Sequence, residues 1–280
     1  MRYLVLADIH GNMPALRAVL AHPEARGCDR VISLGDHTGF GPEPRQAQET
    51  LERLGAVILL GNHEDRLNRI HDQQFSGYNW ELLRWTKEQM AGLDTRFPTD
   101  MRIGPVLLTH GAPGDPFRLM DPATLPPLMA GLPGDVRFLV SGHNHTAWQV
   151  HACGREAFNP GSLGLSEDGV GGNAPFGVMT VVGEDVSLKR YAAPYDLDEV
   201  RRAFVRGGAA KAAPELCRSV LETMTGGLYQ NSLKFVRSGL RVAQERGLPA
   251  GNAEVWREAA RRWWPDDTLL FWKRMEETLL

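Results

Sequence analysis

Apolar runs of strand length alternate with helical periodicity through the first part of the chain. Residues 3–7, 30–34 and 56–60 are short apolar runs, which predicts buried strands. Between them, residues 12–21 and 43–54 carry apolar side chains at helical spacing. This alternation predicts βαβ units with parallel strands.

The pattern changes after two further predicted helices at 62–71 and 80–90. Seven apolar runs then follow with turn residues and few helices between them, at 101–103, 105–109, 136–141, 146–151, 155–158, 176–182 and 185–191. A βαβ half followed by a strand-rich half predicts two packed sheets with helices outside, an α/β (α+β) fold. The Pro- and Gly-rich loops at 111–117, 131–135 and 159–175 are candidates for a substrate rim, because loops on a rigid scaffold often carry recognition.

From Tyr195 the pattern is helical. The predicted helices are Leu197–Val205, Ala212–Met224, Tyr229–Glu245, Ala253–Trp264 and Asp267–Leu279. We therefore expect a catalytic domain over 1–191 and a C-terminal helical extension over 192–280 that packs on it. The extension contains Trp256, Trp263, Trp264 and Trp272. We interpret these as packing residues, with a homo-oligomer formed through the C-terminal helices as the alternative.

Composition and charge narrow the class of protein. The chain is 42% hydrophobic and 23% charged, which is typical of a protein with a large core. It has no run of about 20 apolar residues that could span a membrane, and a strand at the N-terminus leaves no room for a signal peptide. Cys28, Cys153 and Cys217 form no CxxC pair and are interpreted as free thiols. These features predict a cytoplasmic protein, and the net charge of −3 gives no strong nucleic-acid signal.

Side chains that can bind metals follow five of the apolar runs. The segments are Asp8-Ile9-His10, Gly35-Asp36, Gly61-Asn62-His63-Glu64, His110-Gly111 and Gly142-His143-Asn144-His145. Neighbouring strands lie about 4.8 Å apart, so groups at neighbouring strand ends can converge. Oxygen and imidazole donors without thiolate suit Mn, Fe or Zn better than Ca or Mg. The set therefore predicts a metal centre, for two metals, and hydrolysis of phosphate esters.

These segments resemble the motifs of the calcineurin-like metallophosphoesterase superfamily. The superfamily pattern is D-x-H, G-D, G-N-H-[D/E], an isolated His and G-H-x-H, and all five blocks occur here in that order between residue 1 and about residue 190. Further similarity over 35–42 and 159–162 resembles the compact bacterial and archaeal YfcE-like branch of phosphodiesterases and phosphatases. The resemblance implies a four-layer αββα sandwich of two mixed sheets, here with extra C-terminal helices.

The resemblance also implies a role for each motif residue. Asp8, His10 and His145 would hold one metal. Asn62, His110 and His143 would hold the other, and Asp36 would bridge the two. His63 would lie over the phosphate as a general acid, which makes His63, Asn62 and Asp36 the implied catalytic set.

The implied cofactor is a pair of divalent ions, Mn²⁺ first, with Fe, Zn or Ni as alternatives. The implied reaction is hydrolysis of phosphodiester or phosphomonoester bonds by in-line attack of a metal-bridging hydroxide. A small phosphate ester, a nucleotide or a phosphoprotein would each be a substrate of this chemistry, and the fold does not choose among them.

Two other functions share this fold. A non-catalytic interaction scaffold, similar to the retromer scaffold subunit, is one, but the presence of His63 and every expected ligand favours an enzyme. A nuclease is the other, but the chain shows no strong basic patch. His37 departs from the branch pattern, which usually has an apolar residue there; it could contact substrate, orient a ligand or face away, and we favour a non-catalytic role. Glu64 could contact residues around the metal ligands, but we favour its interpretation as a carboxylate at a helix N-terminus.

Overall fold

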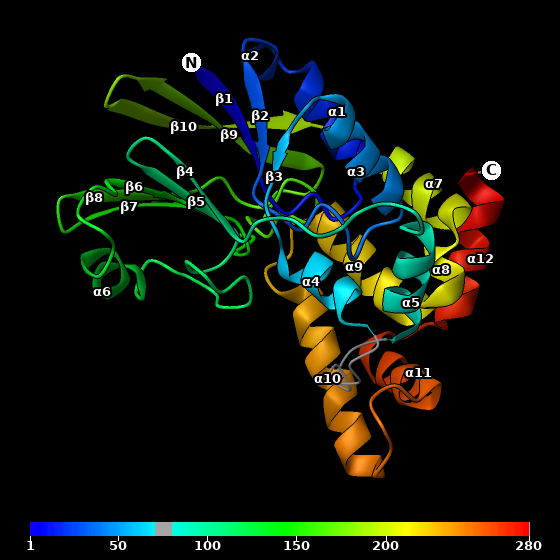
Figure 1. Ribbon diagram of the computed structural model, residues 1–280. Coiled ribbons are helices and arrows are strands. Elements are labelled where there is room, and N and C mark those ends of the chain that lie inside the picture. Colours follow the sequence, from blue (N-terminus) through cyan, green and yellow to red (C-terminus); the bar gives the residue numbers. More distant parts are fainter. Residues whose placement is uncertain (71–79, 280) are drawn as a thin grey trace.

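Two five-stranded sheets pack face to face in the computed structural model, which describes residues 1–70 and 80–279 (Figure 1). The strand order of the first sheet is β10-β9-β1-β2-β3. Its strands are β1 (Arg2–Leu6), β2 (Arg30–Ser33), β3 (Val57–Ile58), β9 (Asn173–Val182) and β10 (Asp185–Pro194). β1, β2 and β3 run parallel, whereas β9 and β10 pair antiparallel, so the sheet is mixed.

The second sheet is also mixed, with the order β4-β5-β6-β8-β7. Its strands are β4 (Asp100–Ile103), β5 (Val106–Thr109), β6 (Phe138–Val140), β7 (Trp148–Ala152) and β8 (Arg155–Asn159). β5, β6 and β8 are parallel, and the edge strands β4 and β7 pair antiparallel. The sequence-based prediction of two mixed sheets is therefore confirmed.

Both faces of β1 are buried, which explains its unbroken apolar sequence. Side chains alternate between the faces of a strand. Val5 points into the core between the sheets, where it packs with residues such as Val106 of the second sheet. Leu4 and Leu6 point the other way, against α1 (Met13–Ala21) and α3 (Pro44–Arg53). Burial on both faces is what strands between two layers require.

A short helix covers the outer face of the second sheet and completes the four layers. α6 (Leu125–Ala130) buries Leu125 and Met129 against Trp148 and Ala157 of that sheet. The sequence pattern did not predict α6, because six residues with two prolines are too short to show helical periodicity. The one-turn helix α2 (Pro23–Arg26) was missed for the same reason.

Two helices follow the third strand. α4 (Asn62–Asn68) begins at the G-N-H-E motif and ends before the predicted limit at 71, and α5 (Trp80–Gln89) matches the predicted helix over 80–90. Residues 71–79 lie outside the described part of the chain.

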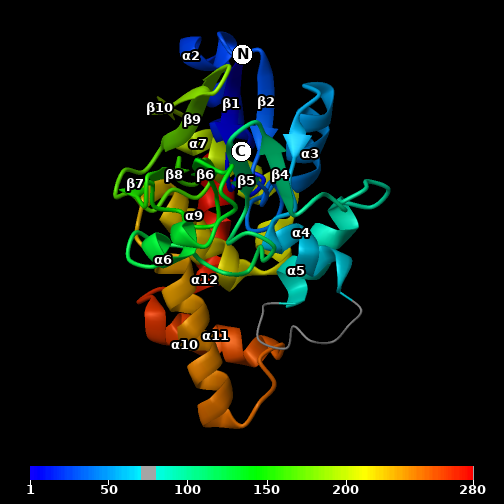
Figure 2. The ribbon, with the colours of Figure 1, turned by 60° about the vertical axis from the view of Figure 1, so that its left-hand side comes forward.

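Six helices form the C-terminal extension. They are α7 (Leu197–Gly207), α8 (Ala209–Ala212), α9 (Pro214–Gly226), α10 (Asn231–Arg246), α11 (Ala253–Trp263) and α12 (Thr268–Leu279). In both views α10 extends away from the two sheets with α11 beside it (Figures 1 and 2). Among the described residues, no helix is both long and apolar enough to cross a membrane.

The tryptophans of the extension are packing residues. Trp256, Trp264 and Trp272 are buried in one apolar cluster, which Trp85 of α5 also joins. Trp256 Nε1 donates to the Ala250 carbonyl at 2.8 Å, and Trp272 Nε1 donates to the Pro214 carbonyl at 3.0 Å. The packing interpretation of these side chains is therefore confirmed, and the cluster attaches the C-terminal helices to α5.

Candidate metal centre

The predicted site residues lie just beyond the ends of strands from both sheets. The loop after β1 carries Asp8 and His10, and the loop after β2 carries Asp36. The first turn of α4, after β3, carries the third motif. The loops after β5 and β6 carry the remaining histidines. Parallel strands bring their carboxyl ends to the same edge of a sheet, so residues far apart in the sequence meet there.

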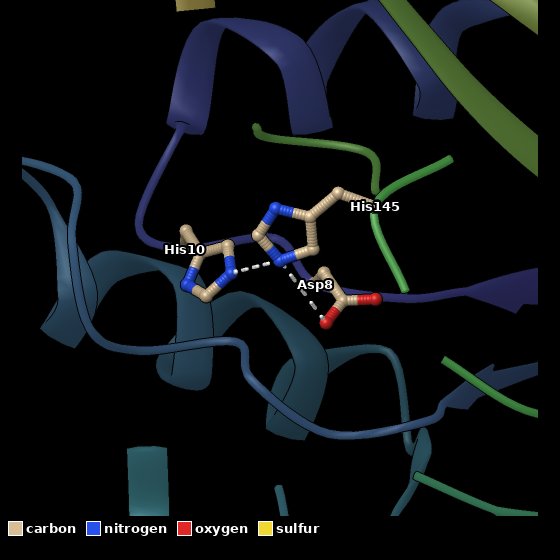
Figure 3. A group of neighbouring side chains, drawn as sticks. All are labelled: Asp8, His10 and His145. Carbon is tan, nitrogen blue, oxygen red and sulfur yellow. Dashed lines mark hydrogen bonds and ion pairs between the residues drawn. The ribbon is translucent and has the colours of Figure 1, made fainter. Parts of the chain in front are cut away.

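Asp8, His10 and His145 form one group of potential metal ligands (Figure 3). His145 Nε2 lies 3.1 Å from His10 Nε2 and 3.7 Å from Asp8 Oδ1. Nitrogen and oxygen ligands lie about 2.0–2.2 Å from an ion such as zinc, so two ligands of one ion are about 3–4 Å apart. The spacing within this group matches that requirement.

A second group consists of Asp36, His110 and His143. His110 Nε2 lies 3.4 Å from Asp36 Oδ2 and 3.0 Å from Asn62 Oδ1. A third group consists of His10, Asp36 and His63, whose ligand atoms lie within 4.8 Å of one another. The Asp36 carboxylate therefore lies near His10 of the first group as well as within the second.

The histidines present one ring nitrogen to the cluster and bind an acceptor with the other. His10 Nδ1 lies 3.1 Å from the Thr38 carbonyl oxygen, and His110 Nδ1 lies 2.9 Å from the Leu34 carbonyl oxygen. Such contacts hold the proton on the outer nitrogen and leave the lone pair of the inner one for a metal.

The remaining two histidines follow the same arrangement. His143 Nε2 lies 3.2 Å from the Phe117 carbonyl oxygen. His145 Nδ1 lies 3.7 Å from a carboxylate oxygen of Glu167. Sequence reasoning missed Glu167, which stands in a Gly-rich loop and belongs to none of the motifs.

The surroundings of the Asn62 amide test whether this donor set fits a cation. The inward-facing atom of the amide lies 2.9 Å from His143 Nδ1, 3.1 Å from Asp36 Oδ2 and 3.0 Å from His110 Nε2. A carboxylate, two imidazoles and an amide oxygen are all donors that a divalent transition-metal ion accepts. Their close spacing around one point fits such an ion.

Four of the candidate ligands have left-handed backbone conformations. The φ angles are 52° at Asp8, 47° at His10, 51° at Asp36 and 64° at His143. Such angles are uncommon outside glycine and cost free energy, so the surrounding structure must impose them. The His143 N–H donates to the Asp8 carboxylate at 3.0 Å, which joins loops from the two sheets.

The buried Glu64 carboxylate holds the Asp36 loop in place. It accepts hydrogen bonds from the backbone N–H groups of Asp36 at 2.9 Å and Thr38 at 2.9 Å. It also accepts from the Gly61 N–H at 3.0 Å, at the start of α4. The helix N-terminal role expected for Glu64 is confirmed, and the same carboxylate positions the Asp36 backbone.

His37 points away from the candidate ligands. It is buried, with Nε2 at 3.1 Å from Gln48 Oε1 of α3 and Nδ1 at 3.5 Å from Glu64 Oε1. Of the three interpretations of His37, the structure favours the one in which it faces away.

The Asn159-Pro160-Gly161-Ser162 segment supports the ligand loops from behind. Asn159 Nδ2 donates to the carbonyls of Gly142 and Asn144, both at 2.9 Å, on either side of His143. Ser162 Oγ donates to the Asp8 carbonyl at 2.8 Å. These residues fix the backbone that presents the candidate ligands.

Burial and neighbouring charges shift several pKa values in this cluster. Burial raises the pKa of Asp8 to about 6 and lowers the pKa of His143 to about 3. Burial also opposes the charged form of His110, but the carboxylates of Asp36 and Asp8 outweigh it and raise the His110 pKa to about 9. The neighbouring carboxylates therefore favour the protonated form of His110.

His63 stands beside the cluster at the wall of a cavity. Its Nε2 lies 3.9 Å from Asp36 Oδ2. Its ring packs edge-on against the Phe40 ring, with the two ring centroids 4.6 Å apart. Burial lowers the pKa of His63 to about 3. Gly39, at φ 113°, packs against this ring so closely that a Cβ atom there would overlap it.

The cavity in front of the cluster has a volume of about 310 Å³. Besides Asp36, Asn62 and His63, its lining includes Arg66 of α4 and residues from the start of α10. Sequence reasoning missed both additions. Helical spacing places Arg66 one turn after His63 and could have indicated it, whereas no pattern linked α10 to the motifs.

Comparisons with known proteins agree with this geometry. A family model described as the calcineurin-like phosphoesterase superfamily domain matches residues 1–182. The uncharacterised protein MJ0912 of Methanocaldococcus jannaschii is 26% identical over 175 residues, covering 59% of this chain and 70% of that protein.

Two solved structures share the fold. A metallophosphoesterase from Sphaerobacter thermophilus has a TM-score of 0.66 and 23% identity, with 81% of this chain and 100% of that chain covered. The hypothetical protein PH1004 from Pyrococcus horikoshii has a TM-score of 0.67 and 18% identity, with 81% of this chain and 99% of that chain covered. Because the family match spans well over half of the sequence and includes every candidate ligand, the chain belongs to the calcineurin-like phosphoesterase superfamily.

Proposed function

We propose that this protein is a dinuclear metal-dependent phosphoesterase that hydrolyses phosphodiester or phosphomonoester bonds. The observation that carries the proposal is the position of Asp36, whose carboxylate lies within 4.8 Å of a ring nitrogen of His10 and of ring nitrogens of His110 and His143. In this proposal Asp8, His10 and His145 hold one ion. Asn62, His110 and His143 hold the other, and Asp36 contacts both.

The charges of the proposed ligands favour an anionic substrate. Two bound divalent ions would lower the pKa of a water molecule that attacks phosphorus and would stabilise charge on the phosphate. Asp8 and Asp36 offset only part of the positive charge of two such ions. The neutral amide of Asn62 preserves the excess, so the centre attracts a phosphate group.

His63 is proposed as the general acid for the leaving group. Its ring lines the cavity, and although it lies near His10 and Asp36 in a third group of possible ligands, the proposal assigns it to the substrate. Burial keeps the ring neutral in the metal-free protein. A phosphate anion beside the ring would raise the pKa of His63. The ring can then take up a proton from solvent and donate it to the leaving alkoxide.

Mn²⁺ is the proposed ion. The donor set contains imidazole nitrogens, carboxylates and one amide, without thiolate. This mixture suits Mn²⁺, with Fe, Zn and Ni as the alternatives, better than it suits Ca²⁺.

The proposal is tested by assaying purified protein on bis(p-nitrophenyl) phosphate and on p-nitrophenyl phosphate. Protein stripped with a chelator should be inactive, and added Mn²⁺ should restore hydrolysis of at least one substrate. The ratio of the two rates then separates diester from monoester preference. Inactivity on both substrates after Mn²⁺ loading would contradict the proposed function.

A further inference from the structure

We propose that the start of α10 forms an apolar subsite that binds the organic group of the substrate and selects phosphate esters with an aromatic ring. This inference rests on the proposed function and adds a substrate class to it. It concerns the part of the cavity lining that the C-terminal extension supplies.

One cavity is lined both by residues of the metal centre and by residues at the start of α10. The first set includes His63 and the candidate ligands Asn62 and His143, and the second includes Tyr229 and Leu233. The ester group of a phosphate held by the metals would therefore share this cavity with the α10 side chains.

Several apolar side chains that line this cavity are large and exposed. Tyr229 is 57% exposed, Leu119 is 49% exposed and Leu233 is 41% exposed. Exposed apolar residues need no explanation when they are scattered. These three converge on one cavity beside a metal centre, and clustered apolar surface around a few polar groups is typical of ligand sites.

The chain conformation before α10 brings these side chains to the cavity. Gln230 has a left-handed φ of 53° and precedes the first residue of the helix. Its side-chain amide donates to the Tyr229 hydroxyl at 3.1 Å. This turn places Tyr229 ahead of the helix, so that its ring lines the same cavity as Leu233.

Hydrogen bonds fix the end of α9 and the turn that follows it to the catalytic part. The Gly169 N–H donates to the Gly227 carbonyl at 2.9 Å, and the Gly172 N–H donates to the Met224 carbonyl at 3.4 Å. The loop that contains Gly169 also carries Glu167, which contacts His145. The apolar wall is therefore anchored next to the candidate ligands.

The chemistry of this wall favours a flat apolar group. Tyr229 can stack on a ring, and Leu119 and Leu233 can cover its edges. Transfer of a phenyl group from water to such a wall buries more apolar area than transfer of a methyl group. We expect phenyl compounds to bind at least about tenfold tighter than methyl compounds.

The test uses two phosphonates, which bind as phosphate analogues but contain no ester bond to hydrolyse. Calorimetry on the full-length Mn²⁺-loaded protein should give a Kd for phenylphosphonate about tenfold below that for methylphosphonate. Leu233→Ala and Tyr229→Ala should each reduce this ratio by about threefold or more. Leu240→Ala is the matched control, since Leu240 is an exposed α10 residue outside the cavity lining, and it should keep the wild-type ratio.

Each other outcome has a separate meaning. Equal affinity for the two phosphonates, or an unchanged ratio in both variants, would overturn the subsite while leaving the metal centre intact. Failure of the loaded protein to bind either phosphonate would contradict the proposed function itself. If sedimentation shows a dimer that Leu233→Ala dissociates, and the ratio is near one, the patch binds a second copy of the chain and the proposal is wrong.

Discussion

At the scale of single residues, His63 and Asp36 are neighbours with different surroundings. Candidate ligands surround the Asp36 carboxylate, which accepts a hydrogen bond from the backbone N–H of His63 at 2.8 Å. The His63 ring contacts Phe40 and faces the cavity. This difference separates a residue that would hold metal from one that would act on the substrate.

His63→Ala should therefore keep both metals and lower kcat by about 10²- to 10⁴-fold, the usual size of a general-acid contribution. Asp36→Asn should lose metal and activity together, because it removes the carboxylate that is proposed to contact both ions. Metal content by elemental analysis, measured with turnover on the same samples, checks both variants. Equal metal loss in the two variants would contradict the assigned roles.

The raised pKa of His110 predicts a pH dependence of metal binding. Below its pKa of about 9, His110 in the metal-free protein holds a proton that a metal must displace. The apparent affinity for Mn²⁺ should thus rise about tenfold per pH unit for each displaced proton, between about pH 7 and pH 8. Calorimetric titrations in buffers of different ionisation enthalpy would count the released protons. A flat affinity over this range would argue against His110 as a ligand.

Single residues also show what the sequence could and could not predict. Motif spacing predicted that Asp8, Asp36 and His143 would meet, and the structure brings them together. Their roles as ligands stay a prediction. The neighbour Glu167 was not predicted, because its contact with His145 depends on the path of an irregular loop rather than on periodicity.

At the scale of elements, Gly239 allows α10 and α11 to pack closely together. A Cβ atom built at Gly239 of α10 would lie 2.5 Å from Cζ3 of Trp256 in α11. Trp256 is buried, so its ring has little room to move.

Gly239→Ala should destabilise the protein by about 1 kcal/mol or more, measured as a lower midpoint of urea denaturation. Alanine alone would favour the helix by about 1 kcal/mol, but overpacking a buried contact costs about 1–3 kcal/mol. Ser238→Ala, on the same helix, is the control and should change stability by less than about 0.5 kcal/mol. A more stable Gly239→Ala variant would show that the two helices are not packed this closely.

Elements with strong periodicity were predicted best. The strand over 3–7 and the helix over 12–21 agree with β1 and α1 to within a residue or two. The strand predicted over 56–60 is shorter in the structure and covers only Val57–Ile58. Pairing with neighbouring strands, rather than the propensity of the residues, sets how far a strand extends. The helix predicted from Ala212 begins instead at Pro214, after the short helix α8 that starts beyond the left-handed Gly208.

At the scale of the whole molecule, the candidate ligands join loops from both sheets. Asp8 and Asp36 follow strands of the first sheet, whereas His110 and His143 follow strands of the second. These ligands come together only when the protein is folded. A metal bound between them would therefore link the two sheets and stabilise the folded state. Metal binding and global stability are therefore coupled.

Mn²⁺ should raise the thermal midpoint of the chelator-stripped protein. At a free concentration 100 times the Kd, binding to one site adds about 2.7 kcal/mol to the free energy of unfolding. For a chain of this size that corresponds to a rise of several degrees in Tm. Asp36→Asn should show a much smaller rise, and an unchanged Tm of the wild-type protein at saturating Mn²⁺ would contradict the coupling.

The most direct test of the account is a crystal structure of the Mn²⁺-loaded protein with anomalous scattering recorded for manganese. The account predicts two anomalous peaks about 3.5–4 Å apart, with the Asp36 carboxylate in contact with both. Asp8, His10 and His145 should surround one peak, and Asn62, His110 and His143 the other. A single peak, or peaks away from Asp36, would contradict the dinuclear centre.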